Sequence, residues 1–161
     1  MSTELYPIGI SGKTDKYTDV AFDAQYEKTF AASSLIAHTT YINETRNLDY
    51  TFANGGVTSD HQKLNTFKVD LNYNIPQGLA FMVGYFNING DKDPVYYATR
   101  TGSPNSSGVT LQVTFIPWLN TQFAIQYVAY SKFNGSSRNY DGSGRNASDN
   151  NTIYMNSWLM F

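Results

Sequence analysis

Hydrophobic and polar residues alternate along several segments of the chain, and a period of two residues predicts β-strands. In residues 108–116, for example, Leu111 and Val113 would face one side of a sheet while Gln112 would face the other. The pattern predicts seven strands, at residues 17–27, 33–44, 63–75, 79–89, 108–116, 121–132 and 151–161. Residues 79–89 are apolar on both sides, so the pattern leaves the orientation of that strand open.

The last predicted strand has one mostly apolar face and ends on an aromatic residue. Its apolar face would carry Ile153, Met155, Leu159 and Phe161, with Ser157 as the weak position. A transmembrane β-strand needs about 9–11 residues when it is tilted across a bilayer.

The predicted connections alternate between short and long. Short ones lie near residues 27–32, 75–78 and 116–120, while long ones span 45–62, 90–107 and 134–150. The long segments are rich in Gly, Asn, Ser, Asp and Thr, a composition that predicts no core of their own. Short turns at one rim and long loops at the other are typical of an outer-membrane barrel, with periplasmic turns and extracellular loops.

The composition fits this class of protein. The chain has 161 residues, of which 41% are hydrophobic and 16% aromatic, and its mean hydropathy is −0.40. A β-barrel distributes its apolar residues by alternation, so a low average is expected. The absence of cysteine excludes disulfides and thiolate metal sites. A net charge of −2 argues against a nucleic-acid partner. An ordinary soluble all-β domain remains an alternative on composition alone.

Alternation assigns side chains to two faces of the predicted barrel wall. In residues 33–44 we favour an outward Leu35 and Tyr41, because this turns His38 inward. The residues expected to face lipid are Phe22, Phe67, Val69, Leu71, Leu111, Val113, Phe123 and Ile125. The residues expected to face the lumen are Asp19, Asp23, Gln25, His38, Lys68, Asp70, Asn72, Thr110, Gln112, Thr114, Gln122 and Gln126.

Several segments carry a resemblance to a known family. Residues 64–68, 84–86, 133–135 and 139–152, followed by the closing aromatic strand, resemble the C-terminal part of bacterial outer-membrane porin-like β-barrels. Members of this group are often encoded near multihaem cytochromes. The resemblance implies a single segment, residues 1–161, from a larger barrel. It also implies that the terminal strand, with Ile153, Met155, Leu159 and Phe161, is the signal read by the assembly machinery. Its partners would be the lipid bilayer, the barrel-assembly machinery, upstream strands of the same protein, and a cytochrome. A small closed barrel with an eighth strand at residues 4–11 is the alternative architecture.

Candidate chemistry is sparse. His38 and His61 are isolated histidines without a partner at metal-ligand spacing, so we expect a lumen residue and a loop residue. The acidic residues of segment 141–149 miss the spacing of a calcium loop. We therefore predict no catalytic group, no metal and no cofactor, and we do not expect an enzyme.

The sequence thus predicts an all-β, antiparallel transmembrane barrel segment in a bacterial outer membrane. The expected function is passive passage of small hydrophilic solutes or ions, because polar lumen residues of mixed charge replace hydration without trapping a solute. One alternative is a structural sheath or docking barrel for a cytochrome or another secreted partner. The other is a soluble β-sandwich or lipocalin-like ligand binder.

Overall fold

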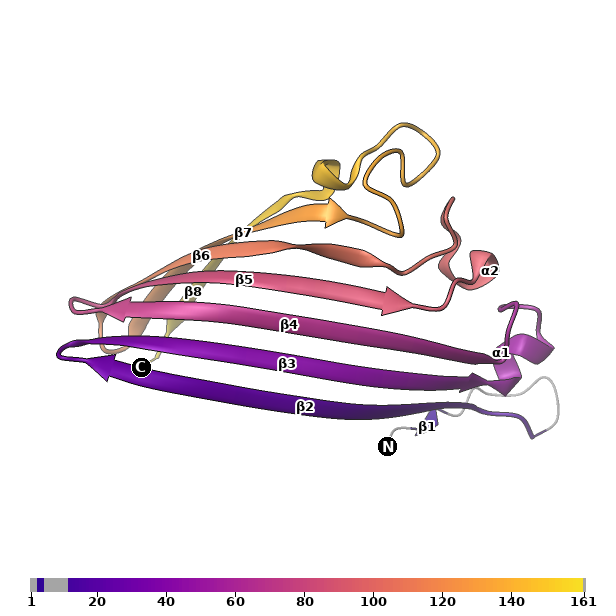
Figure 1. Ribbon diagram of the computed structural model, residues 1–161, viewed down its shortest axis with the longest axis horizontal. Coiled ribbons are helices and arrows are strands. Elements are labelled where there is room, and N and C mark those ends of the chain that lie inside the picture. Colours follow the sequence, from indigo (N-terminus) through magenta and orange to yellow (C-terminus); the bar gives the residue numbers. More distant parts are fainter. Residues whose placement is uncertain (1–2, 5–11, 161) are drawn as a thin grey trace.

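The chain folds into one antiparallel β-sheet whose strands follow each other in chain order (Figure 1). The computed structural model describes residues 3–4 and 12–160. The strands are β1 (Thr3–Glu4), β2 (Asp15–Phe30), β3 (Ser33–Leu48), β4 (His61–Ile75), β5 (Leu79–Gly90), β6 (Ser106–Trp118), β7 (Thr121–Lys132) and β8 (Thr152–Leu159). The predicted all-β, antiparallel meander is therefore confirmed.

Most strands are longer than the alternation predicts. β7 has the predicted bounds, whereas β2 also includes residues 15–16 and 28–30, and β3 also includes residues 45–48. Most residues of these extensions are polar, and the apolar Phe30 and Leu48 each stand alone, so no alternating pattern reports them. His61 is consequently the first residue of β4 and not a loop residue as predicted. Phe161 lies outside the described residues.

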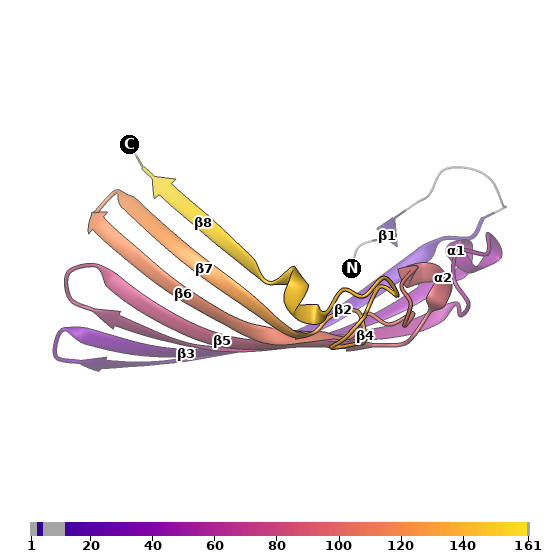
Figure 2. The ribbon, with the colours of Figure 1, turned by 90° about the horizontal axis from the view of Figure 1, so that it is seen from above.

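The sheet is curved into an open trough (Figure 2). Within the described residues, β8 pairs only with β7, and the outer edge of β2 pairs with β1 at two positions, through Asp15 and Lys16. The alternative of a small closed eight-strand barrel is therefore wrong for this part of the chain. The strand proposed at residues 4–11 falls almost entirely outside the described residues.

The short connections are tight because the backbone adopts conformations that few residues allow. At the turn between β4 and β5, Gln77 and Gly78 both have positive φ angles, of 75° and 74°. A Cβ at Gly78 would lie 2.2 Å from the Ile116 carbonyl oxygen, so this position requires glycine. At the turn between β2 and β3, Ala31 also has a positive φ angle, of 49°. The third short connection joins Trp118 of β6 to Thr121 of β7.

The long connections are ordered, contrary to the prediction that they have no core. They contain the short helices α1 (Asp49–Ala53), α2 (Pro94–Tyr97) and η1 (Ala147–Asn150). The most buried apolar side chains of the described chain include Leu48, Val57, Tyr140 and Ala147, all in or beside these loops. The amino-acid composition of the loops did not predict this small core, because hydrogen bonds to buried carboxylates hold it together and no run of apolar residues marks it.

Candidate functional site

The two faces of the sheet differ in chemistry. In an antiparallel sheet, directly opposed residues point to the same face. One row of opposed residues is Leu71, Val83, Leu111, Tyr127 and Ile153, and the row beside it is Tyr73, Phe81, Val113, Ile125 and Met155. All residues predicted to face lipid lie on this apolar face, as do Ile153, Met155 and Leu159 of β8. Strand β5, which the sequence left unoriented, places Phe81 and Val83 here.

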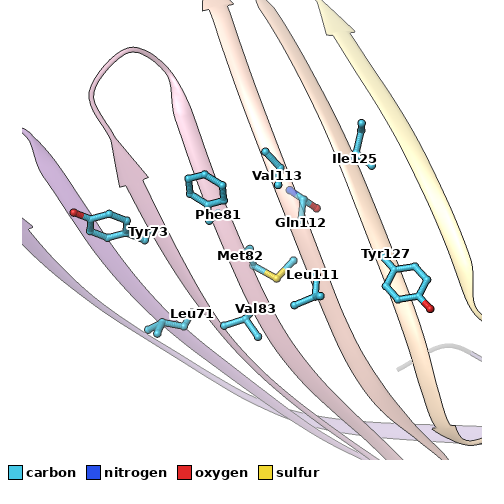
Figure 3. A pocket seen from close by; sticks show the side chains of 10 residues that line it. All are labelled: Leu71, Tyr73, Phe81, Met82, Val83, Leu111, Gln112, Val113, Ile125 and Tyr127. Carbon is cyan, nitrogen blue, oxygen red and sulfur yellow. The ribbon is translucent and has the colours of Figure 1, made fainter.

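Exposure indicates that the apolar face is the convex one. Val83 and Leu111 are 50% and 48% exposed, whereas Thr114 and Ala124 on the opposite face are 9% and 6% exposed. Side chains on the inner side of a curved sheet crowd together and cover one another. The convex face also carries a shallow groove of about 720 Å³ over β4–β7 (Figure 3). We call the two surfaces the convex apolar face and the concave polar face.

The convex apolar face forms a band of limited height. On β4 the band covers residues 67–75, and on the loop side of it Asn65 and Lys63 follow on the same face. A tilted strand needs about 9–11 residues to cross the hydrocarbon core of a bilayer. The band therefore has the height of one transmembrane crossing, and β4 continues beyond it toward the long loops.

Tyrosines on the loop side of this band contact asparagines. The hydroxyl of Tyr41 donates to Asn65 Oδ1 at 2.9 Å, and the hydroxyl of Tyr127 accepts from Asn151 Nδ2 at 2.9 Å. The rings lie on the apolar face while their hydroxyls meet polar groups, which is the arrangement that tyrosine adopts at a membrane–water interface.

All residues predicted to face the lumen lie on the concave polar face. His38 connects three strands there, because its Nε2 lies 2.7 Å from Asp23 Oδ1 and its Nδ1 lies 3.2 Å from Asp70 Oδ2. Thr40 donates a further hydrogen bond to Asp23, and Asn72 donates one to Asp70. His38 is thus part of a hydrogen-bonded cluster that the sequence did not reveal.

Charge is distributed unevenly over this face. Carboxylates gather on β2–β4, namely Asp19, Asp23, Glu27, Glu44 and Asp70. The same strands present Arg46, which pairs with Glu44, and Lys68. Strands β5–β8 carry one charged residue, Lys132, at the loop end of β7. In their place, amides form contacts such as Gln126 Nε2 to Gln112 Oε1 at 2.9 Å. One half of the trough is acidic and the other is neutral.

A buried carboxylate links two of the long loops at one end of the sheet. Asp93 is fully buried and caps α2 by accepting from the backbone N–H groups of Val95 and Tyr96. It also accepts from the Thr58 N–H at 2.7 Å and from Gln62 Nε2 at 2.6 Å, which ties two loops together. Burial alone would raise the pKa of Asp93, but the hydrogen bonds from the Tyr96 and Thr58 backbone outweigh it and lower the pKa.

A chain of aromatic rings attaches the last long loop to the concave polar face. Phe86 and Tyr130 make an edge-to-face contact with centroids 5.5 Å apart, and Tyr130, Phe133 and Tyr140 continue it at 5.1 and 5.0 Å. Edge-to-face packing of this kind adds about 0.5–1.5 kcal/mol per pair. The loop is therefore held against the sheet by its own buried Tyr140.

The loop segment considered for calcium uses its carboxylate internally. Asp141 Oδ1 accepts from the backbone N–H of Ser143 at 2.9 Å and of Arg145 at 3.2 Å, and these bonds, the first the stronger, lower the pKa of Asp141. Among the described residues, no group of three or more histidine or acidic side chains has the geometry to hold a metal ion. No helix of the described chain is long and apolar enough to span a membrane.

No protein-family model matches the chain, and no curated protein or solved structure matches it.

Proposed function

We propose that this sheet is part of the wall of a β-barrel in a bacterial outer membrane, and that the barrel passes small hydrophilic solutes or ions passively. The polarity of the sheet carries this proposal. In a soluble barrel or lipocalin-like binder, the concave face would be apolar and the convex face polar. Here the crowded concave face is polar and the exposed convex face is apolar, which suits lipid outside and water inside.

The curvature and the open edges support the same proposal. Within the described residues, β8 pairs only with β7, and β2 pairs with β1 at only two positions, so both edges have room for further strands. Unpaired edges are costly in a membrane, so we expect such strands to be present. Upstream strands of a longer chain are the simplest source of those strands. The barrel-assembly machinery would recognise β8, whose outer face presents Ile153, Met155 and Leu159 in alternation.

A cysteine scan in cells tests which face meets lipid. The chain has no cysteine, so each introduced thiol is unique. Thr110→Cys and Gln112→Cys should react with a water-soluble maleimide, because they line the lumen. Val109→Cys, Leu111→Cys and Val113→Cys should react only with a lipid-soluble maleimide in outer-membrane fractions. Reaction of both sets with the water-soluble reagent would refute the membrane wall.

Passage is tested separately from insertion. Liposomes that contain the purified protein should swell in isotonic solutions of small hydrophilic solutes, and planar bilayers should show steady conductance. The sheath alternative predicts the same cysteine pattern with little conductance, because a bound partner fills the lumen. The soluble alternative predicts recovery of the protein without detergent.

A further inference from the structure

The concave polar face contains a hollow at Gly84. Register places Gly84 of β5 between Asp70 and Thr110, and Gly108 of β6 between Phe86 and Tyr130. Gly84 contributes no side chain and lines a hollow of about 380 Å³, whereas the Phe86 ring occupies the space over Gly108. This size lies in the range of small-molecule sites.

Close approach of the backbone makes glycine necessary at one of these positions. A Cβ at Gly108 would lie 2.2 Å from the Ala129 carbonyl oxygen and 2.9 Å from the Phe86 ring. A Cβ at Gly84 would meet Asp70 Cβ at 3.3 Å, a tight contact that small shifts relieve. Gly84 can therefore be replaced to fill the hollow, whereas Gly108 cannot be replaced without moving the backbone.

The walls of the hollow offer two opposite charges and an apolar surface. Lys68 and Asp70 of β4 lie on the same face, two residues and about 7 Å apart along the strand. Phe86 lies directly opposite Lys68 on the neighbouring strand β5, and its ring makes an edge-to-face contact with Tyr130 of β7. Thr110 lies at the floor beside Gly84.

Several polar groups around the hollow have capacity to bind a ligand. Within the described chain, the Lys68 ammonium group has no ion pair or hydrogen bond, and neither does the Thr110 hydroxyl group. The Gln126 amide donates to Gln112, which leaves its own oxygen free. Asp70 accepts from Asn72 and lies 3.2 Å from His38 Nδ1, and a carboxylate offers about four acceptor positions in total.

We propose that this hollow is a binding site for an apolar α-amino acid. The ligand carboxylate would pair with Lys68, and the ligand ammonium group would pair with Asp70. The apolar side chain of the ligand would lie against Phe86 and Tyr130. The paired charges give specificity, because a simple anion would be repelled by Asp70 and a simple cation by Lys68.

This inference deepens the proposed function, because it names a class of solute that the wall would select. It does not depend on passage, since binding can be measured on the folded protein in detergent. The site is partly open to solvent, so we expect a dissociation constant near the millimolar range, which suits a solute that must leave again.

Ligand-detected NMR with leucine on the detergent-solubilised protein tests the chemistry of the site. Isovalerate lacks the ammonium group of leucine, and isopentylamine lacks its carboxylate. Each should bind at least about tenfold more weakly than leucine, because one charge of the site stays unpaired. Glucose should show no saturable binding. If isovalerate or glucose binds as tightly as leucine, the proposed ligand class is wrong.

Variants test the location. Gly84→Val should reduce leucine binding at least about tenfold by filling the hollow, and Lys68→Gln should do the same by removing the cation. The matched control Ala129→Val adds similar bulk on the convex apolar face and should bind like the wild type. If Gly84→Val does not fold, leucine binding by Lys68→Gln and the comparison of ligands still test the site. Wild-type binding by Lys68→Gln would overturn the site.

Failure of the site and failure of the wall are distinguishable. If the protein conducts ions but binds no leucine, only the binding site is refuted. If the protein binds leucine but stays outside the membrane fraction, the proposed function is refuted and the site stands.

Discussion

Replacing Leu111 by arginine separates a lipid-facing surface from a water-facing one. Leu111 lies directly opposite Val83 in the middle row of the convex apolar face, and its side chain is 48% exposed. In water, an exposed substitution of this kind changes stability by about 0.5 kcal/mol or less, and the arginine stem still covers its neighbours. At the midplane of a bilayer, arginine costs about 2–4 kcal/mol. A lipid-facing and a water-facing Leu111 therefore predict losses in the free energy of unfolding that differ several-fold.

The matched control is Met82→Arg. Met82 lies beside Val83 on β5 but points to the concave polar face, and within the described chain it makes no hydrogen bond that arginine would break. Unfolding by urea in phospholipid vesicles can be monitored by gel mobility, with heated samples as the unfolded reference. The free energy of unfolding should fall by about 2–4 kcal/mol for Leu111→Arg and by less than about 1 kcal/mol for Met82→Arg. Equal losses for the two variants would refute the assignment of the faces.

Other consequences of the structure are open to measurement. Asp23→Asn together with Asp70→Asn should lower the cation-to-anion permeability ratio in planar bilayers; an unchanged reversal potential in a salt gradient would contradict a role for the acidic half. Asp93→Ala should destabilise the loops by about 2–3 kcal/mol, since it removes a cap and leaves buried donors unpaired. The pKa of Asp93 is lower in the folded protein than in the unfolded chain, so Asp93 stabilises the loops above pH ~4 and this stabilisation is lost as the pH falls further. Limited proteolysis of the wild type should therefore cut the loops faster at pH 3 than at pH 7. Protease added to intact cells should cut within residues 134–150 but not near Pro76, and the opposite result would invert the topology.

The sequence predicted the parts of the fold that depend on a period of two. Strand β7 was placed correctly because Phe123, Ile125 and Tyr127 alternate with less apolar residues over its whole length. The ends of β2 and β3 were missed because most of their residues are polar and the apolar Phe30 and Leu48 each stand alone. The short helices α1 and α2 have too few residues for a helical period. The start of α1 is bound by Asp15, which lies far from it along the chain, and α2 is capped by the adjacent Asp93.

The hollow on the concave polar face could not be predicted from the sequence. Gly84 lies in the strand whose two faces are both apolar, so its direction was unknown. Gly108 was the first residue of a predicted strand. Only the register, which sets Gly84 between Asp70 and Thr110, shows that this glycine lies on the concave polar face at the hollow. The alternation of residues gives the faces of a strand, but not the alignment of one strand with the next.

The division of charge between the two halves of the trough bears on how the wall would enter a membrane. Strands β5–β8 expose no charged side chain within the apolar band, whereas β2–β4 carry carboxylates at the same depth. Inserting an uncharged hairpin avoids the cost of a charge at the midplane, which is about 2–4 kcal/mol for a basic residue and less for an acidic one. We expect β7 and β8 to enter the bilayer first and the acidic strands to follow once water fills the forming lumen. Lipid protection of Ile125→Cys earlier than of Phe22→Cys during refolding into vesicles would show this order.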